Sequence, residues 1–151
     1  MVCYEKYEVL RALETWQQAG AFFVRIQGMD REYHIALRNE FDEHDGPDCK
    51  YIVLTEDGYP FATCRFYEVD ENTVVIGRVV VLQEYRGHEF GAKVIKEAEK
   101  WIEELGYSEI YLDSRTVAVG FYEKLGYALV DGSIVNSSGF ECKRMYKSIN
   151  R

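Results

Sequence analysis

The sequence has little proline, no long apolar run and no basic cluster, and each absence excludes a class of protein. Pro47 and Pro60 are the only prolines in 151 residues, so no proline-rich linker divides the chain. No apolar run approaches the roughly 18 residues of a membrane span, and residues 1–5 lack the apolar core of a secretion signal. A net charge of −8 without a basic cluster argues against nucleic-acid binding. We therefore expect a cytoplasmic protein that contacts neither membranes nor nucleic acids.

Cysteine and histidine are also scarce, and their spacing matches no metal site. Cys3, Cys49, Cys64 and Cys142 lie far apart in the sequence and form no paired motif. This spacing indicates reduced structural thiols rather than a disulfide framework or a zinc site. Because the histidines are isolated as well, we expect no bound metal.

What the chain does have is enough apolar material for one compact domain. It is 47% hydrophobic and 15% aromatic, too apolar for a disordered segment. At this length a domain can bury roughly two thirds of its unfolded surface without disulfides. We expect a single domain over residues 1–151.

Apolar periodicity predicts the elements of the first half. Intervals of three and four predict a helix over residues 7–26. Two β-prone runs, 51–55 and 59–69, flank Asp57-Gly58 and predict a hairpin. The run 73–82 lacks alternation, which is typical of a strand buried on both faces. The apolar positions of the first helix are Val9, Leu10, Leu13, Trp16, Ala19, Phe22 and Phe23.

The second half combines helices and strands. Residues 90–105 form the clearest amphipathic helix, residues 108–112 a strand and residues 116–125 a second helix. Residues 127–130 and 140–146 are expected to be strands separated by a loop rich in Gly, Ser and Asn. The strand-helix-strand order from residue 74 to 112 requires a parallel pair. The predicted fold class is α/β (α+β), with a mixed, mostly antiparallel central sheet.

The junction between the strand 73–82 and the helix 90–105 is the most informative segment. A helix N-terminus presents unpaired N–H groups and a partial positive charge, which attract phosphates. Gly87 and Gly91 give a ligand access to the backbone, and Arg86 adds a positive charge. The alternative is that Gly87 serves a turn and Gly91 close helix packing. The spacing matches neither a Walker loop, which argues against a P-loop-like nucleotide enzyme, nor a dinucleotide fingerprint.

Two segments resemble the signatures of one family. Residues 79–92 read VVVLQEYRGHEFGA and resemble the acyl-CoA signature of the GNAT superfamily of N-acetyltransferases, Arg/Gln-x-x-Gly-x-Gly/Ala. Residues 118–127 read AVGFYEKLGY and resemble its second signature, Ala-x-x-Phe-Tyr-x-x-x-Gly-Phe/Tyr. The two stand at the expected separation, and residues 40–45, EFDEHD, resemble a branch of small bacterial members.

The resemblance implies the GNAT fold, in which helices cover both faces of the sheet and two parallel strands splay apart. It also implies acetyl-CoA as co-substrate, with pantetheine beside the first splayed strand and pyrophosphate on the loop that follows. The implied cofactor-binding residues are Val79, Val80, Val81, Arg86, Gly87, His88, Glu89, Phe90, Gly91, Ala92 and Arg115. Glu89 replaces the middle glycine of the signature, which places a carboxylate near the pyrophosphate. Arg115 replaces a common asparagine.

The resemblance also implies catalytic roles. Tyr122 stands where the family has the tyrosine that protonates the departing thiolate, and a phenol and a thiol have pKa values close enough for that transfer. The alternative is that Tyr122 is a core aromatic. Gly77 stands where the family often has a glutamate base. Asp113 is our candidate base, although it could simply cap the next helix, and His44 is a second candidate, although it could be an exposed loop residue.

The expected activity is transfer of an acetyl group to a small-molecule or peptide amine by direct attack on the thioester. The alternative is a non-catalytic module of the same fold that binds CoA or a protein. Five carboxylates over residues 40–48 could attract an amine, but we favour a solvated acidic loop. An exposed sheet edge would also be compatible with a homodimer.

Overall fold

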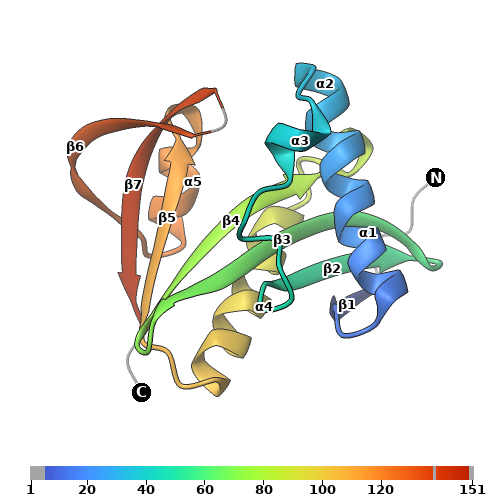
Figure 1. Cartoon of the computed structure of the whole chain (residues 1–151), viewed down its shortest axis with the longest axis horizontal. Helices are drawn as coiled ribbons and strands as arrows, with labels where there is room; N and C mark the ends of the chain where they lie inside the picture. Colours follow the sequence, from blue (N-terminus) through green and yellow to red (C-terminus); the bar gives the residue numbers. More distant parts are fainter. Residues whose placement is uncertain (1–5, 138, 150–151) are drawn as a thin grey trace.

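The computed structural model describes residues 6–137 and 139–149, and its centre is a seven-stranded sheet (Figure 1). The strand order is β1-β2-β3-β4-β5-β7-β6, and every neighbouring pair is antiparallel except β4 and β5. The strands are β1 Tyr7–Arg11, β2 Lys50–Glu56, β3 Tyr59–Asp70, β4 Thr73–Val81, β5 Glu109–Arg115, β6 Ala128–Ser137 and β7 Phe140–Ser148. This arrangement confirms the predicted mixed sheet with one parallel pair.

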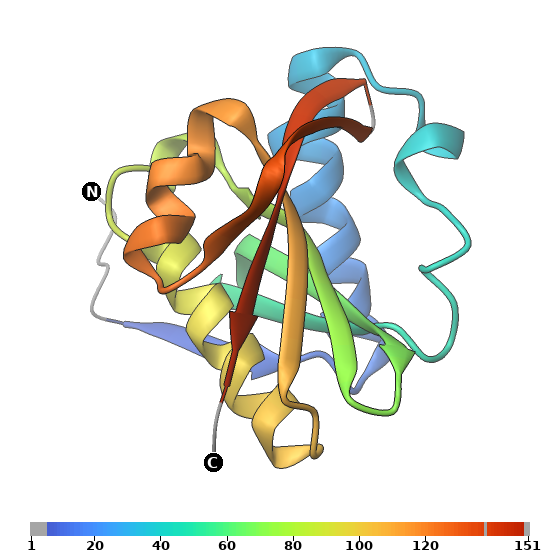
Figure 2. The same cartoon turned by 90° about the vertical axis from the view of Figure 1, so that its left-hand side faces the viewer.

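Helices lie on both sides of the sheet, as the resemblance implied (Figure 2). One side carries α1 Thr15–Arg25, a π-helical turn Ile26–Asp30, α2 Arg31–Tyr33 and α3 Leu37–Glu40. The other carries α4 Phe90–Glu104 and α5 Val119–Lys124. Short 3₁₀ turns, Gln83–Tyr85 and Thr116–Ala118, precede α4 and α5. Among the described residues, no helix combines the length and apolar character needed to cross a bilayer.

The main core lies between the sheet and α4. The buried stripe of α4 packs against apolar side chains of β2, β3, β4 and β5. Its members are Phe90, Val94, Ile95, Ala98, Trp101 and Ile102. Burying six such side chains stabilises the domain by roughly 1.5–3 kcal/mol for each large one. This core fixes the start of α4 against the end of β4.

The parallel pair β4 and β5 separates soon after it begins. Only Thr73, Val74 and Val75 pair with β5, at Glu109, Ile110 and Tyr111. Beyond Val75 the two strands diverge, and the V between them is visible in Figure 1. A bulge supports this bend, because the register with β3 jumps from Thr63↔Val80 to Arg65↔Gly77. Bulges bend a strand and increase its twist.

The N-terminal helix prediction is wrong in its start and in its buried face. Residues 7–11 form β1, an edge strand paired with β2, and α1 begins only at Thr15. Leu13 is 75% exposed and Trp16 is 53% exposed, whereas Gln17, Ala21 and Val24 face the sheet. The residues that α1 buries are Gln17, Ala21, Val24 and Arg25, so half of them are polar and apolar spacing alone does not identify the buried face.

Two further expectations are corrected. Residues 128–137 form one strand paired with β7, with a register shift between Leu129 and Ile134, so most of the expected loop is strand. Its backbone pairs despite the Gly, Ser and Asn content because β7 offers a free edge. In β4, Val74 and Ile76 are buried while Val75 and Gly77 are half-buried, so the strand alternates rather than being covered on both faces.

Candidate active site

A cleft of about 340 Å³ fills the V between β4 and β5. It is bounded by β4, by the end of β5 and by the first turn of α5, and residues of the α1–α3 side close its other wall. The lining residues used below are Glu40, Gly77, Val79, Val80, Asp113, Arg115, Phe121 and Tyr122. Because β5 does not pair with β4 beyond Val75, the β4 backbone groups on this side can bond to an extended ligand.

The loop after β4 leads into the helix that we expect to hold phosphates. Phe90 is 2% exposed and packs edge-on against Tyr7 and Phe61, which anchors the first turn of α4. Gly87 adopts φ +85°, a left-handed conformation that favours glycine. Gly87, His88 and Glu89 are exposed, and Gly91 and Ala92 are half-buried. The turn that precedes α4 therefore lies at the surface, at the end where a helix has N–H groups without intrahelical partners.

Glu89 also has a left-handed backbone, with φ 66° and ψ 19°. For a residue with a Cβ, this conformation costs roughly 1–2 kcal/mol. The geometry explains why the signature has glycine at this position. The Glu89 side chain is exposed and its carbonyl accepts a hydrogen bond from Lys93 N at 3.2 Å.

Arg86 uses its side chain to join elements. Its Nε donates to the Val81 carbonyl at 2.8 Å and its Nη2 donates to the Gly28 carbonyl at 3.0 Å. Glu32 lies 3.4 Å from the same Nη2. Arg86 thus ties the end of β4 to the π-helical turn, and any contact with phosphate would come from its backbone or from a rearranged side chain.

Tyr122 is placed against the cleft by α5. The residue is 8% exposed, and its ring packs edge-on against Phe121 and Tyr127. Burial raises the pKa of Tyr122, so the phenol keeps its proton at neutral pH. Gly91 lets α4 and α5 approach, because a Cβ there would lie 3.2 Å from the Phe121 ring. Phe121 and Tyr122 both line the cleft.

Known proteins carry the same architecture. The profile described as "Acetyltransferase (GNAT) family" matches residues 10–127. A Bacillus subtilis protein designated a presumed acetyltransferase is 34% identical over 71% of this chain and 74% of its own. The chain belongs to the GNAT family of acetyltransferases.

Solved structures agree with this assignment at the level of the fold. A presumed N-acetyltransferase from Lactobacillus plantarum superposes with a TM-score of 0.88 and 26% identity, covering 96% of this chain and 99% of that one. An aminoglycoside 6'-N-acetyltransferase complexed with coenzyme A superposes with a TM-score of 0.75 and 16% identity, covering 100% and 98%. The sequence resemblance to the GNAT superfamily is thereby confirmed.

The structure shows the surroundings of Gly77 and of the candidate base Asp113. Gly77 lines the cleft without a side chain, and nothing lies within 4 Å of a Cβ built there, so open space remains at this point of β4. Asp113 lines the cleft but is held by Arg144, with Nε–Oδ1 at 2.8 Å and Nη2–Oδ2 at 3.1 Å. Asp113 does not cap the following turn, whose N-cap is Arg115 and has no side-chain bond.

Arg115 forms part of the cleft wall on the α2 side. Its guanidinium lies 4.4 Å from the centroid of Phe140 and 5.2 Å from that of Tyr33. Its Nη1 is 3.3 Å from the Tyr33 hydroxyl. The arginine therefore links α2 to the start of β7 at the end of β5.

The expectation of a solvated acidic loop over residues 40–48 is wrong for its central members. Glu40 is 1% exposed, and Asp42 and Asp45 are also largely removed from solvent. They pair with three arginines from α1, β3 and β4: Arg25–Glu40 at 2.9 Å, Arg25–Asp45 at 2.8 Å, Arg65–Asp42 at 2.8 Å and Arg78–Glu40 at 3.1 Å. We call these six residues the ion network.

The ion network cannot be predicted from its carboxylates alone, because several acidic residues close together in the sequence usually form a solvated loop. The available signal was three arginines, Arg25, Arg65 and Arg78, inside otherwise apolar segments, since a buried guanidinium needs carboxylate partners. Glu40, Arg65 and Arg78 all line the cleft, so the network forms its wall on the α1–α3 side. Asp30 was missed as well, and it lies beside Glu40.

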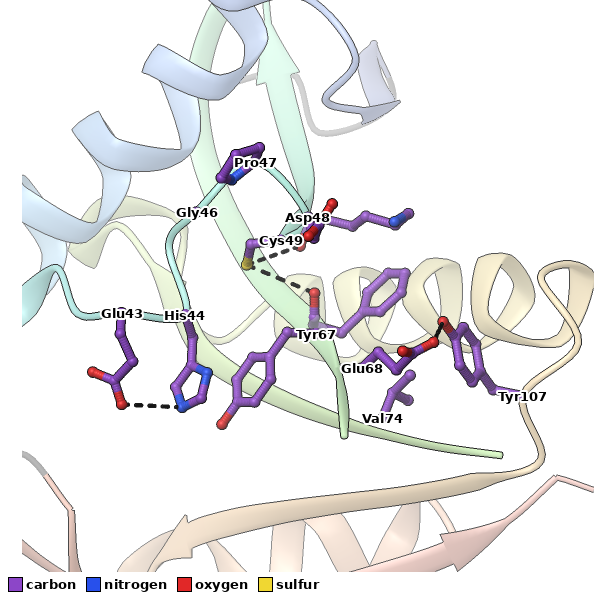
Figure 3. A pocket seen from close by; sticks show the side chains of 12 residues that line it. Glu43, His44, Gly46, Pro47, Asp48, Cys49, Tyr67, Glu68, Val74 and Tyr107 are labelled. Carbon is purple, nitrogen blue, oxygen red and sulfur yellow. Dashed lines mark hydrogen bonds and ion pairs between the residues drawn. The ribbon is translucent and has the colours of Figure 1, made fainter. Parts of the chain in front are cut away.

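A second, larger pocket of about 560 Å³ lies where β2 begins (Figure 3). His44 lies there rather than among the cleft residues, stacked on Tyr67 with a centroid separation of 3.9 Å. Its Nε2 is 3.5 Å from Glu43. Tyr67 borders both pockets. The structure therefore does not bring His44 to the GNAT cleft.

Metal-ligating residues do not gather around the site. Within residues 6–137 and 139–149, no group of three or more His, Cys, Asp and Glu side chains is placed to hold a metal ion. Cys49, Cys64 and Cys142 are buried and not bridged to one another. Cys3 lies outside the described residues.

Proposed function

We propose that the protein is an N-acetyltransferase that moves the acetyl group of acetyl-CoA to an amine by direct attack. The observation that supports this most is the cleft between β4 and β5, with the accessible start of α4 beside it and the Tyr122 phenol in its wall. We further propose that residues 1–151 act as one domain. A cytoplasmic location fits the unbridged thiols of Cys49, Cys64 and Cys142.

The residues present fit the donor. Val79, Val80 and Val81 would pair with the pantetheine arm through backbone groups on the side away from β3, where β5 does not pair with them. The Val81 carbonyl already accepts from Arg86 Nε. The N–H groups from Gly87 to Ala92 would bond the pyrophosphate at the N-terminus of α4. The donor supplies an activated acetyl thioester. The protein supplies alignment, which can contribute about 7 kcal/mol or more to a reaction between two bound molecules.

Groups of the protein would then act on two atoms of the thioester, the carbonyl oxygen and the sulfur. Backbone N–H groups of the splayed part of β4 would stabilise the oxyanion that forms as the amine attacks the thioester carbonyl. Tyr122, kept neutral by burial, would donate its proton to the departing sulfur. The amine would enter from the side of α1–α3, opposite α4 and α5 (Figure 2).

Two measurements on wild-type protein and on Tyr122→Phe test the proposal. Calorimetry should show acetyl-CoA binding to both proteins. Transfer to four probe amines (putrescine, glycine, kanamycin and a tripeptide with a free N-terminus) should fall about 100-fold in the variant. Tyr127→Phe is the matched control, because Tyr127 is buried beside Tyr122 but donates to Glu99 instead of lining the cleft. Equal rates in Tyr122→Phe would remove the phenol from the mechanism.

The alternative, a non-catalytic module that binds CoA, is favoured by the absence of a side chain at Gly77 and by the Glu89 carboxylate. It predicts calorimetric binding of acetyl-CoA without transfer to any of the four amines. Absence of both binding and transfer would contradict both functions.

A further inference from the structure

The carboxyl group of Asp30 is in an unusual environment. Asp30 ends the π-helical turn, is 3% exposed, and has no hydrogen-bond partner for either carboxyl oxygen among the described residues. A buried carboxylate without partners is costly, and most buried polar groups in proteins are paired. Such a group needs an explanation.

The explanation lies in its neighbour, Glu40. The Glu40 carboxyl group is near enough to act on Asp30 both as a hydrogen-bonding group and as a charge. Two carboxylates can only accept hydrogen bonds. A single proton placed between them would satisfy both. Burial, followed by the adjacent Glu40, raises the pKa of Asp30 to about 7. The other charged groups that act on Asp30 are Arg25 and Arg78, and both lower its pKa.

Glu40 connects this pair to the cleft. Its Oε2 accepts from Arg25 Nε at 2.9 Å and lies 3.1 Å from Arg78 Nε, which fixes the carboxyl group in place. Glu40 lines the same cleft as Gly77 and Tyr122. Gly77 supplies no base, and the Asp113 carboxylate is occupied by two bonds from Arg144. Arg144 holds both oxygens of Asp113, whereas Arg25 Nε and Arg78 Nε both contact Oε2 of Glu40, and the Asp30 oxygens are unpartnered among the described residues. The Asp30–Glu40 pair is therefore the carboxyl group at the cleft with a place for an incoming proton.

We propose that the Asp30–Glu40 carboxyl pair takes the proton that the acceptor amine must lose, with Glu40 as the catalytic residue that faces the cleft and Asp30 as the positioning residue behind it. The inference rests on the proposed acetyl transfer. An ammonium proton passes to the pair, and the nitrogen lone pair forms the C–N bond. The C–S bond then breaks, and the sulfur takes the Tyr122 proton. The second nitrogen proton returns to the Tyr122 oxygen.

Asp30→Asn is the decisive variant, because an amide keeps the shape and can donate to Glu40 but cannot take up a proton. With the fastest of the four probe amines, kcat/KM of the wild type should rise with pH to a plateau, with a midpoint near pH 7. In Asp30→Asn that rise should disappear, and kcat/KM at about pH 8 should fall roughly 100-fold. Calorimetric affinity for acetyl-CoA should not change.

Two further variants make the result specific. Asp48→Asn changes an exposed carboxylate of the same loop that borders only the larger pocket, and its profile should match the wild type. Asp113→Asn should keep the rise near pH 7. If Asp113→Asn abolishes that rise, or if Asp30→Asn retains it, the proposal is overturned.

The proposed function and this inference fail in different ways. Wild-type protein that transfers to none of the four amines overturns both, whereas transfer with an unchanged profile in Asp30→Asn overturns only the inference. Carboxyl ¹³C NMR of the wild type gives a test independent of the variants. One aspartate signal should titrate near pH 7, and titration of every aspartate below about pH 5 would overturn the proposal.

Discussion

At the scale of single residues, Asp30 couples stability to pH. Its folded-state pKa of about 7 lies above the ordinary value of 3.8 because burial and Glu40 disfavour its charge. The folded protein therefore holds a proton that the unfolded chain has lost between these two pH values. Stability from this group is complete below about pH 4, decreases as the pH rises to about 7, and then stays constant.

Asp30→Asn should remove this dependence. At pH 4 the variant and the wild type should unfold at nearly the same urea concentration, and by pH 8 the variant should be more stable, by up to roughly 4 kcal/mol. Urea titrations at four pH values between 4 and 8 measure the difference. A difference that does not grow with pH would mean that Asp30 ionises normally in the folded protein.

Glu89 is the second residue with a local conflict, a side chain at a left-handed position beside the expected phosphate site. Glu89→Gly should raise stability by about 1 kcal/mol and tighten acetyl-CoA binding, because it removes both backbone strain and a repulsive carboxylate. Thermal melts and calorimetry measure the two effects.

Glu89→Ala is the matched control, since it removes the charge but keeps the Cβ. It should share the gain in affinity and show no gain in stability. If the alanine variant is stabilised as much as the glycine variant, the backbone conformation is not the cause.

At the scale of elements, the placement of β4 depends on close contact with the π-helical turn. A Cβ on Gly28 would lie 2.6 Å from Val80 Cγ1, which is closer than atoms can pack. Gly28→Ala should cost about 1–3 kcal/mol and weaken acetyl-CoA binding by shifting β4. Adding Val80→Ala should recover part of the stability because it removes the clashing methyl.

Gly120 provides the control for this experiment. It lies in α5 with nothing within 4 Å of a built Cβ, so Gly120→Ala should stabilise the protein by up to about 1 kcal/mol. Urea unfolding of all four proteins measures the set. Equal costs for Gly28→Ala alone and together with Val80→Ala would show that the contact with Val80 is not responsible.

Elements with local signals were predictable from the sequence. The hairpin around Asp57-Gly58 and the amphipathic α4 have a turn and a periodicity that tertiary contacts do not override. The sequence predicts helix where β1 lies, because Val9 and Leu10 continue the apolar spacing of α1. Pairing with β2 is a long-range contact that no local pattern encodes. For the same reason the sequence predicts only residues 127–130 of this region as strand and the rest of β6 as loop.

The residues of the candidate site likewise divide into those with a local sequence signal and those without one. The loop from Arg86 to Ala92 and Tyr122 could be named from the sequence, because their motifs are contiguous. The Asp30–Glu40 pair and the guanidinium partners of Asp42 and Asp45 come together only in the fold, from α1, β3, β4 and the segments that follow α1. Charge patterns along a sequence do not distinguish a solvated carboxylate from a buried one.

At the scale of the whole molecule, the ion network joins the α1–α3 side to the sheet. Asp45 accepts bonds from Arg25 and from the Tyr51 hydroxyl and lies 2.9 Å from Arg65. Burial acts to raise the pKa of Asp45, but Arg25 and Arg65 outweigh it and hold the pKa well below the ordinary 3.8. The same balance, dominated by Arg65, lowers the pKa of Asp42.

The pKa values of Asp42 and Asp45 shift downward, whereas that of Asp30 shifts upward, so their effects on stability have opposite pH dependence. Below about pH 4 the two aspartates take up protons in the unfolded chain while they are still ionised in the folded protein. Their contribution to the free energy of unfolding is therefore complete above that pH and is lost as the pH falls. Asp45→Asn leaves Arg25 and Arg65 short of a buried partner and should cost about 3 kcal/mol or more at pH 7. The cost should shrink toward pH 2, because below about pH 4 the unfolded wild type becomes protonated and the ionised folded Asp45 no longer contributes fully to stability.

Urea unfolding of Asp45→Asn at pH 7, 4 and 2, beside Asp48→Asn and Asp30→Asn, separates the two pH ranges over which stability changes, below pH 4 and between pH 4 and 7. Asp48 is exposed in the same loop, so Asp48→Asn should stay within about 0.5 kcal/mol of the wild type throughout. Asp45→Asn should change the pH dependence of stability below pH 4, and Asp30→Asn should change it between pH 4 and 7. A constant cost of Asp45→Asn at all three pH values would show that it acts through packing, because only a titrating carboxylate makes the cost depend on pH.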